Sequence, residues 1–170
     1  MPPRKGRFSG LFAAAGVCQA PGMEPIPVDL MSLRDALDDN SMMWYLDLRS
    51  GDLVPVSHDP GMNEFVDTDE IRDNPEIFLK VESRPSREGF AMMEGFVDDL
   101  PEGESKRSLA RALRLPRPFR TFKDTLYDFP EEEKAWFAFR TACLHKAAIR
   151  FLEVNSVPWT SKYPQHDPPA

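Results

Sequence analysis

The stretch Met43-Trp44-Tyr45-Leu46-Asp47-Leu48-Arg49-Ser50-Gly51-Asp52-Leu53-Val54-Pro55-Val56 decides the fold. Two runs rich in aromatic and branched residues flank a Ser-Gly-Asp turn, a pattern that predicts a β-hairpin. Successive side chains of a strand point to opposite faces, so the first strand has two sets of side chains. One face carries Trp44, Leu46 and Leu48, and the other carries Tyr45, Asp47 and Arg49. Pro55 has no N–H to donate, which predicts that the second strand is an edge strand.

The pattern on both sides of the hairpin completes a small α+β fold. Upstream, Leu30, Leu33 and Leu37 share one face of a helix predicted over residues 28–39. Downstream, the acidic stretch 57–75 holds at most one short helix around 67–72, and 77–81 reads as a third strand. We therefore expect an antiparallel sheet of three strands, at about Met43–Leu48, Leu53–Val56 and Ile77–Val81. The N-terminal helix and a C-terminal cluster of three to four helices should cover this sheet.

Everything after Ser86 has helical periodicity. Ser86 is a plausible N-cap for a helix that ends near residue 100, and a second helix over residues 104–115 should stop at Pro116. A short third helix carries Phe119, Phe122 and Leu126. The last helix begins at Pro130 with three glutamates in its first turn and ends near Asn155. Its predicted buried set is Trp136, Phe139, Cys143, Ala147 and Phe151.

Length and composition indicate one domain in an ordinary globular chain of 170 residues, with 41% hydrophobic and 29% charged residues. We expect a disordered extension over 1–25, a single domain over 26–157 and a proline-rich tail over 158–170, with Trp159 and Tyr163 able to fold back. The apolar stretch 8–18 is short and broken by glycines, so we do not interpret it as a signal peptide. The two cysteines form no CxxC motif, which favours a reducing, cytoplasmic location. The net charge of −7 argues against attraction of the whole protein to nucleic acid or to an anionic membrane, so we expect no membrane partner.

Three segments of the chain resemble those of a known family. The hairpin sequence Trp44-Tyr45-Leu46-Asp47-Leu48 through Ser50-Gly51-Asp52 is similar to the motif YLDLxTGE of the uncharacterised bacterial protein family 0158. Residues 119–126 resemble its AFRRFKDxL segment, and residues 136–139 resemble its WYAF stretch. Arg49 and Ser50 depart from the pattern, which often has Glu and Thr there. The resemblance implies a small cytosolic bacterial protein of α+β type and implies no activity.

No catalytic or metal-binding constellation stands out. Adjacent carboxylates such as Asp98 and Asp99 do not face each other on a helix, and the loop around Asp67 lacks the glycine and final glutamate of a calcium loop. Cys143 and His145 lie on different faces of the last helix, and Cys143 is expected in the core. We therefore expect no metal, no cofactor and no catalytic residue that the sequence identifies. The remaining enzyme hypothesis is a hydrolase or transferase whose site residues are dispersed along the chain.

Charge is distributed unevenly along the chain. The net charge is −7, and the acidic N-terminal half (residues 24–82) has fifteen acidic and four basic residues, whereas residues 106–123 have seven basic residues and no acidic residue. Six of these seven form our candidate binding set: Arg107, Arg111, Arg114, Arg117, Arg120 and Lys123. Because the arginine fork matches phosphate oxygens, the set predicts a binding or adaptor module for nucleic acid or an acidic protein. The alternative is that these cations pair with the protein's own acidic N-terminal half.

Overall fold

The predicted hairpin is present in the computed structural model, which describes residues 24–164. Strand β2 (Met42–Asp47) lies in the centre of an antiparallel sheet, between β3 (Leu53–Ser57) and β4 (Phe78–Val81). The order β3-β2-β4 makes β3 an edge strand, as Pro55 predicts. The three-stranded sheet expected for the α+β fold is thus confirmed.

Six α-helices lie within the described residues, close to the predicted positions. They are α1 (Leu30–Asp38), α2 (Thr68–Asp73), α3 (Ser86–Asp99), α4 (Glu104–Ala112), α5 (Pro118–Leu126) and α6 (Pro130–Val154). A single turn of 3-10 helix, η1 (Pro60–Met62), was not expected. Pro85, rather than Ser86, occupies the N-cap of α3 and gives it no side-chain hydrogen bond. None of the helices between residues 24 and 164 is both long and apolar enough to cross a membrane.

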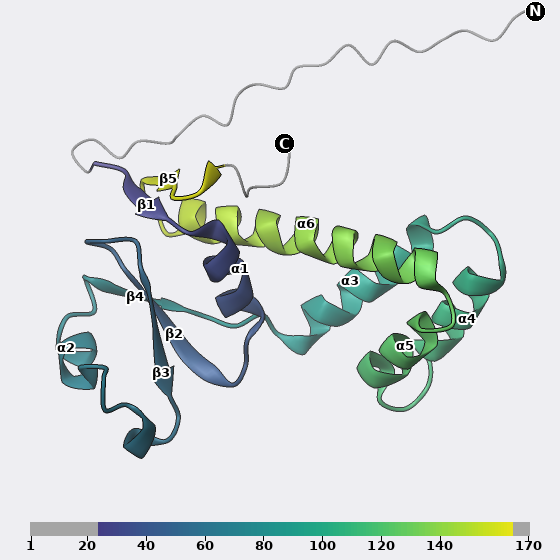
Figure 1. Cartoon of the computed structure of the whole chain (residues 1–170), viewed down its shortest axis with the longest axis horizontal. Coiled ribbons are helices and arrows are strands. Elements are labelled where there is room, and N and C mark those ends of the chain that lie inside the picture. The colour runs from purple at the N-terminus through teal and green to yellow at the C-terminus, as the bar shows by residue number, and fades with distance from the viewer. Residues whose placement is uncertain (1–23, 165–170) are drawn as a thin grey trace, which may run out of the picture.

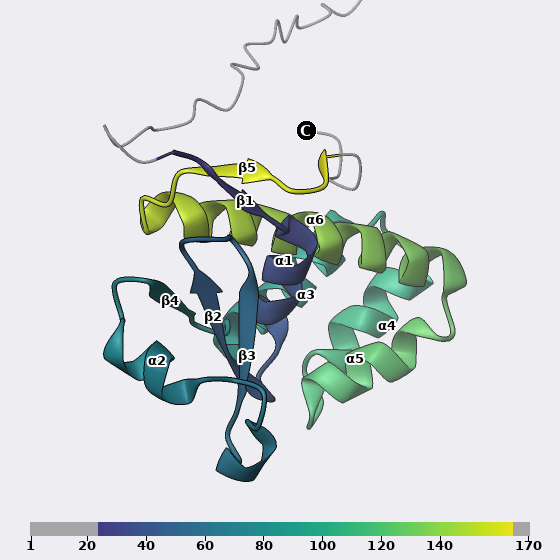
Figure 2. The ribbon, with the colours of Figure 1, turned by 60° about the vertical axis from the view of Figure 1, so that its left-hand side comes forward.

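The two faces of the sheet pack against different elements, as the alternation in β2 predicts. One face joins the core formed with α1 and α6, through Trp44, Leu46, Leu48 and Leu79. The opposite face packs around Ile71 of α2, through Tyr45, Val56 and Phe78. Figures 1 and 2 both show α1 and α2 on opposite sides of the sheet. The hairpin is therefore covered on both faces.

Helix α4 ends three residues earlier than we predicted. The sequence suggested a helix as far as Leu115, but the last α-helical residue is Ala112. The amides of Arg114 and Leu115 donate to the carbonyls of Arg111 and Ala112, at 3.0 and 3.2 Å, so each bond spans three residues rather than four. This tighter geometry is common at helix ends, and a proline disfavours helical conformation in the residue before it. Arg114 consequently lies beyond the helix.

Helix α6 is the longest element and connects two apolar cores (Figure 1). Its second half contributes to the core with α1 and the sheet, and its first half to a core among α3, α4 and α5. The buried positions are Trp136, Leu144, Ala148 and Leu152. Of the predicted set only Trp136 is buried, because Phe139, Cys143, Ala147 and Phe151 are half-exposed. From Cys143 onward, each buried residue lies one position later in the sequence than we predicted. The helix packs against different neighbours along its length, which accounts for this change.

A second, two-stranded sheet joins the ends of the described chain and was not predicted. Strand β1 (Ile26–Val28) pairs in parallel with β5 (Trp159–Ser161). Val28, which we expected in the first helix, is a strand residue, and Asp29 caps α1 by accepting from Met31 N at 3.0 Å. The segment from Pro158, which we expected to be a tail, thus contributes a strand, and Pro158 itself is buried. Three-residue strands are too short to leave a periodic pattern in a sequence.

Parts of the two predicted terminal segments are not described. Residues 1–23 of the expected N-terminal extension and residues 165–170 of the expected C-terminal tail lie outside the described residues. The described part of the second segment contacts the hairpin. Lys162 N donates to Val28 O at 2.9 Å, and its Nζ lies 2.8 Å from Asp52 Oδ1.

Candidate anion-binding surface

The six cations predicted from sequence lie on α4, on α5 and in the turn between these helices. We call them the basic surface: Arg107 and Arg111 on α4, Arg114 and Arg117 in the turn, Arg120 and Lys123 on α5. All six residues are exposed. The packing of the two helices fixes their position: Leu109 and Ala112 of α4 are buried, as are Phe122 and Leu126 of α5, and Leu109, Phe122 and Leu126 belong to one core. The apolar faces of two packed helices therefore direct the four helical cations toward solvent.

Arg117 has an unusual backbone conformation. Its φ and ψ are both 56°, in the left-handed region that residues other than glycine rarely adopt. Local hydrogen bonds fix this turn: Thr121 Oγ1 donates to Pro116 O at 3.0 Å, and Thr121 N donates to Arg117 O at 3.0 Å. Such a conformation costs about 1–3 kcal/mol. Pro118 then begins α5 at a position where its missing N–H is harmless.

The basic surface has little internal neutralisation. Arg120 lies 3.6 Å from Asp124 in an exposed pair one helical turn apart. Between residues 24 and 164 the other five cations form no ion pair. The acidic N-terminal half instead uses other cations, as in the pair of Asp47 with Arg49 at 2.7 Å. Pairing between the basic surface and the acidic half is therefore not seen in this part of the chain.

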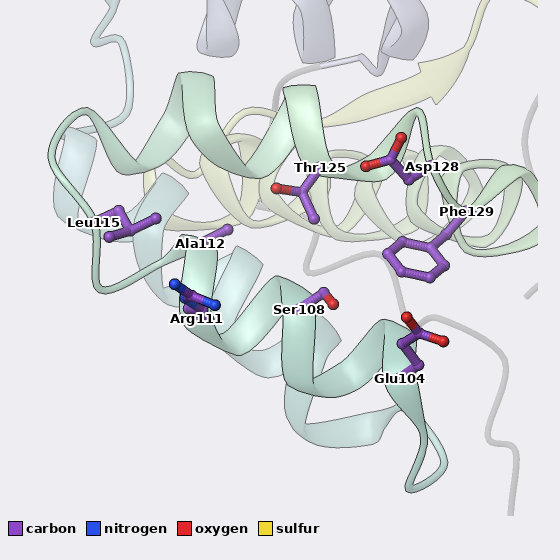
Figure 3. Close-up of a pocket in the computed structure, with 8 residues that line it drawn as sticks. All are labelled: Glu104, Ser108, Arg111, Ala112, Leu115, Thr125, Asp128 and Phe129. Atoms are coloured by element: carbon purple, nitrogen blue, oxygen red, sulfur yellow. The ribbon is translucent and has the colours of Figure 1, made fainter.

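A hollow of about 600 Å³ lies between α4 and α5, beside the basic surface (Figure 3). It is lined by Glu104, Ser108, Arg111, Ala112, Leu115, Thr125, Asp128 and Phe129. Figure 3 shows Arg111 toward one end, and Glu104, Asp128 and Phe129 toward the other. Carboxylates at one end would repel an anion, so the hollow itself does not extend the anion-binding area beyond Arg111.

Lys123 does not line this hollow. It lines a different pocket, which it shares with Arg84 from the β4–α3 connection and Arg140 from α6. We did not predict either arginine as a site residue. The sequence does contain a signal for Arg140, because it lies four residues from both Trp136 and Leu144 and so places a charge within the buried row of α6. Nothing comparable marks Arg84.

Two observations on the described residues bear on the enzyme hypothesis. No group of three or more His, Cys, Asp or Glu side chains within residues 24–164 could hold a metal ion. The pKa values of Asp39, Asp47 and Asp52 are held below the usual aspartate value, chiefly by hydrogen bonds from the side chains of Ser41, Arg49 and Lys162 respectively. A general acid needs a raised pKa, so these carboxyl groups are displaced in the wrong direction for that role. They also lie in the acidic N-terminal half, away from the basic surface.

Comparison with known proteins assigns this chain to a family. The model of the Uncharacterised protein family (UPF0158) matches residues 23–165. The UPF0158 protein PA5073 of Pseudomonas aeruginosa is 28% identical over 138 residues, which are 79% of this chain and 87% of the relative. No solved structure matches the chain. Because the family model covers the whole described region, the chain belongs to the uncharacterised protein family UPF0158.

Proposed function

We propose that this protein is a non-enzymatic binding module whose basic surface contacts the phosphate backbone of nucleic acid. One observation carries the proposal: five exposed cations, on two packed helices and in the turn between them, have no ion-pair partner within residues 24–164. Unpaired arginines present planar donor forks that match phosphate oxygens. An acidic protein could use the same charges and is the alternative partner.

The overall charge limits the expected strength of this interaction. At a net charge of −7, long-range attraction of the whole protein to nucleic acid is unfavourable. Only short-range contacts with the basic surface would favour binding. We therefore expect weak binding that disappears as salt is raised, because each neutralised phosphate releases counterions.

We also infer a cytoplasmic location and a single folded domain over residues 26–157. Cys143 is a free cysteine, which fits a reducing compartment. Helix α6 contributes side chains to both main cores, so unfolding of one core should disturb the other. Strand β5 adds a short segment to this domain beyond residue 157.

Fluorescence anisotropy with short labelled DNA and RNA tests the proposal. The native protein should bind at about 50 mM salt, and the variant Arg111→Ala/Arg114→Ala should flatten the plot of log K against log salt by about two units. The matched control is Arg72→Ala/Lys80→Ala, which removes two exposed cations from the acidic half. This control should retain the native slope.

Three results would contradict the proposal. Absence of nucleic-acid binding by the native protein at about 50 mM salt would end it. Equal loss in the control variant would show that binding follows overall charge and not the basic surface. Binding of a poly-glutamate peptide without binding of nucleic acid would support an acidic protein partner in its place.

A further inference from the structure

A second cationic site lies at the junction of the two main cores, in a pocket of about 320 Å³. Five elements of the chain surround it. The C-terminal end of α1 contributes Asp38, the β4–α3 connection contributes Arg84, and α3, α5 and α6 supply the remaining walls, including Lys123 and Arg140. Arg84 is fixed beside α1, because its backbone N donates to Leu37 O at 2.9 Å. The pocket is therefore formed by tertiary packing and not by one helix or loop.

Positive charge exceeds negative charge in this pocket. Three cationic side chains, Arg84, Lys123 and Arg140, face a single carboxylate, that of Asp38. Arg84 Nη2 donates to Asp38 Oδ1 at 3.2 Å, and Arg140 Nη2 donates to the other oxygen, Oδ2. Lys123 forms no ion pair with any residue between 24 and 164. One carboxylate cannot neutralise three cations, so two positive charges remain uncompensated.

The hydrogen-bonding capacity of the two arginines is also unfilled. Only 15% of the Arg84 side chain is exposed, yet its Nε is buried without a hydrogen-bond partner. A guanidinium group has five N–H donors, and Asp38 engages one nitrogen of each arginine. An unsatisfied buried donor is costly, which favours an additional acceptor at this position. The remaining donors could hold an oxyanion beside Asp38.

The other walls define the rest of the ligand. Four apolar residues line the pocket: Phe119 and Met92, which are accessible, and Phe122 and Trp136, which are buried. Gly89 allows this wall to form, since a Cβ at this position would lie only 3.2 Å from the Phe119 ring. The first turn of α3 adds the positive end of a helix dipole and the Ser86 hydroxyl. A ligand that fits must therefore combine an anionic group with a small apolar body.

We propose that this pocket binds a phosphate monoester of a small organic molecule. At neutral pH such an ester carries close to two negative charges, which match the two uncompensated cations, and its three terminal oxygens match the arginine donors. The apolar body would lie against Phe119 and Met92. The pocket shares Lys123 with the basic surface, but Arg84 and Arg140 are not members of that surface, so binding of a small phosphate ester here does not require nucleic-acid binding there.

Phenyl phosphate is a suitable probe, and isothermal titration calorimetry with the full chain measures its binding. We expect a Kd of about 1 mM or tighter, as is reasonable for a ligand with few non-hydrogen atoms. Phenol, which lacks the anion, and phenyl sulfate, which carries one charge, should bind much more weakly. Lys123→Gln should weaken phenyl phosphate binding about tenfold through loss of one charge-assisted contact. Arg87→Gln is the matched control, because Arg87 is exposed on the first turn of α3 but does not line the pocket.

Lys123 is exposed and unpaired in the described part of the chain, so its substitution should leave the protein folded. Amide shifts in NMR spectra give a second measurement, and we expect phenyl phosphate to move Ser86, Gly89 and Lys123. Absence of binding, equal binding of phenol, or equal binding of phenyl sulfate would overturn the proposal. Equal weakening by Arg87→Gln would overturn the assignment to this pocket, as would shifts confined to α4.

Discussion

The hairpin turn and the first strand approach so closely that a Cβ on Gly51 would lie 2.1 Å from the carbonyl oxygen of Pro27. Gly51 has a φ of +77° and is buried, and its N–H donates to Asp47 O at 2.8 Å. The glycine thus serves two purposes: it closes the turn in a left-handed conformation, and it allows β1 to cross directly over it. This contact connects the three-stranded sheet with the strand pair β1–β5.

Gly51→Ala should therefore destabilise the protein strongly. The left-handed conformation alone costs about 1–2 kcal/mol for alanine, and the clash with a backbone atom must be added, so we expect a loss of at least about 2 kcal/mol in urea unfolding. Gly95→Ala in α3 is the control, because a Cβ added at Gly95 would meet no atom within 4 Å apart from its chain neighbours and the backbone of its own helix. Alanine at that helical position should stabilise by about 0.5–1 kcal/mol. Equal effects of the two substitutions would show that the turn does not pack on β1 in solution.

Local patterns were sufficient for the elements that form most of the fold. The hairpin, the strand ending at Val81 and the long helices follow from alternation and helical periodicity, which depend only on neighbouring residues. The pairing of β1 with β5 could not be predicted, because these strands are three residues long and are separated by most of the chain. The pocket around Arg84 escaped prediction for a similar reason. Its cations come from three elements. Lys123 was predicted only as part of the basic surface, and of the two arginines only Arg140 leaves a signal, as a charge in a buried row.

The pairing of β5 predicts that the C-terminal segment is needed for stability. A chain ending at Val157 lacks the buried Pro158, the half-buried Trp159 and the ion pair of Lys162 with Asp52. We expect its melting temperature to fall by more than about 5 °C, which corresponds to over 1 kcal/mol for a domain of this size. A chain ending at residue 164 keeps these contacts and provides the control. An unchanged melting temperature in the shorter chain would show that this segment is dispensable for stability.

Asp39 should make stability depend on acid pH. Its carboxylate accepts hydrogen bonds from Ser41 N and Oγ, at 2.7 and 2.6 Å, and from Trp44 Nε1 at 2.9 Å, which together hold its pKa below the usual value. A lowered folded-state pKa stabilises the native state above the unfolded value, near 4, and this contribution is lost as pH falls through the folded value. Asp39→Asn should therefore be destabilising at pH 7, and this effect should shrink as falling pH protonates the native carboxylate. A series of urea unfolding curves from pH 7 into the acid range measures the change.

The exposed Asp35 supplies the comparison for this titration. Asp35→Asn removes a carboxylate from α1, the helix that Asp39 caps. Among residues 24–164 its ion pair is with the adjacent Arg34. Its effect should be small at pH 7, since exposed pairs contribute about 0–1 kcal/mol. A loss in Asp39→Asn that does not shrink on acidification would mean that the effect arises from packing around Trp44 and not from the charge.

Arg117 permits a test in which charge and stability change in opposite directions. Glycine adopts the left-handed conformation without steric cost. Arg117→Gly should therefore leave the free energy of unfolding unchanged or raise it by up to about 1 kcal/mol, and the melting temperature should not fall. The substitution also removes one cation from the basic surface and should reduce the salt dependence of nucleic-acid binding by about one unit.

Arg114→Gly removes the same charge from a residue outside the left-handed region. It should reduce the salt dependence equally but destabilise by about 0.5–1 kcal/mol, because glycine gains more freedom in the unfolded chain. If the two variants lose stability equally, the strained turn is not maintained in solution; if both keep the native salt dependence, the turn does not contact phosphate.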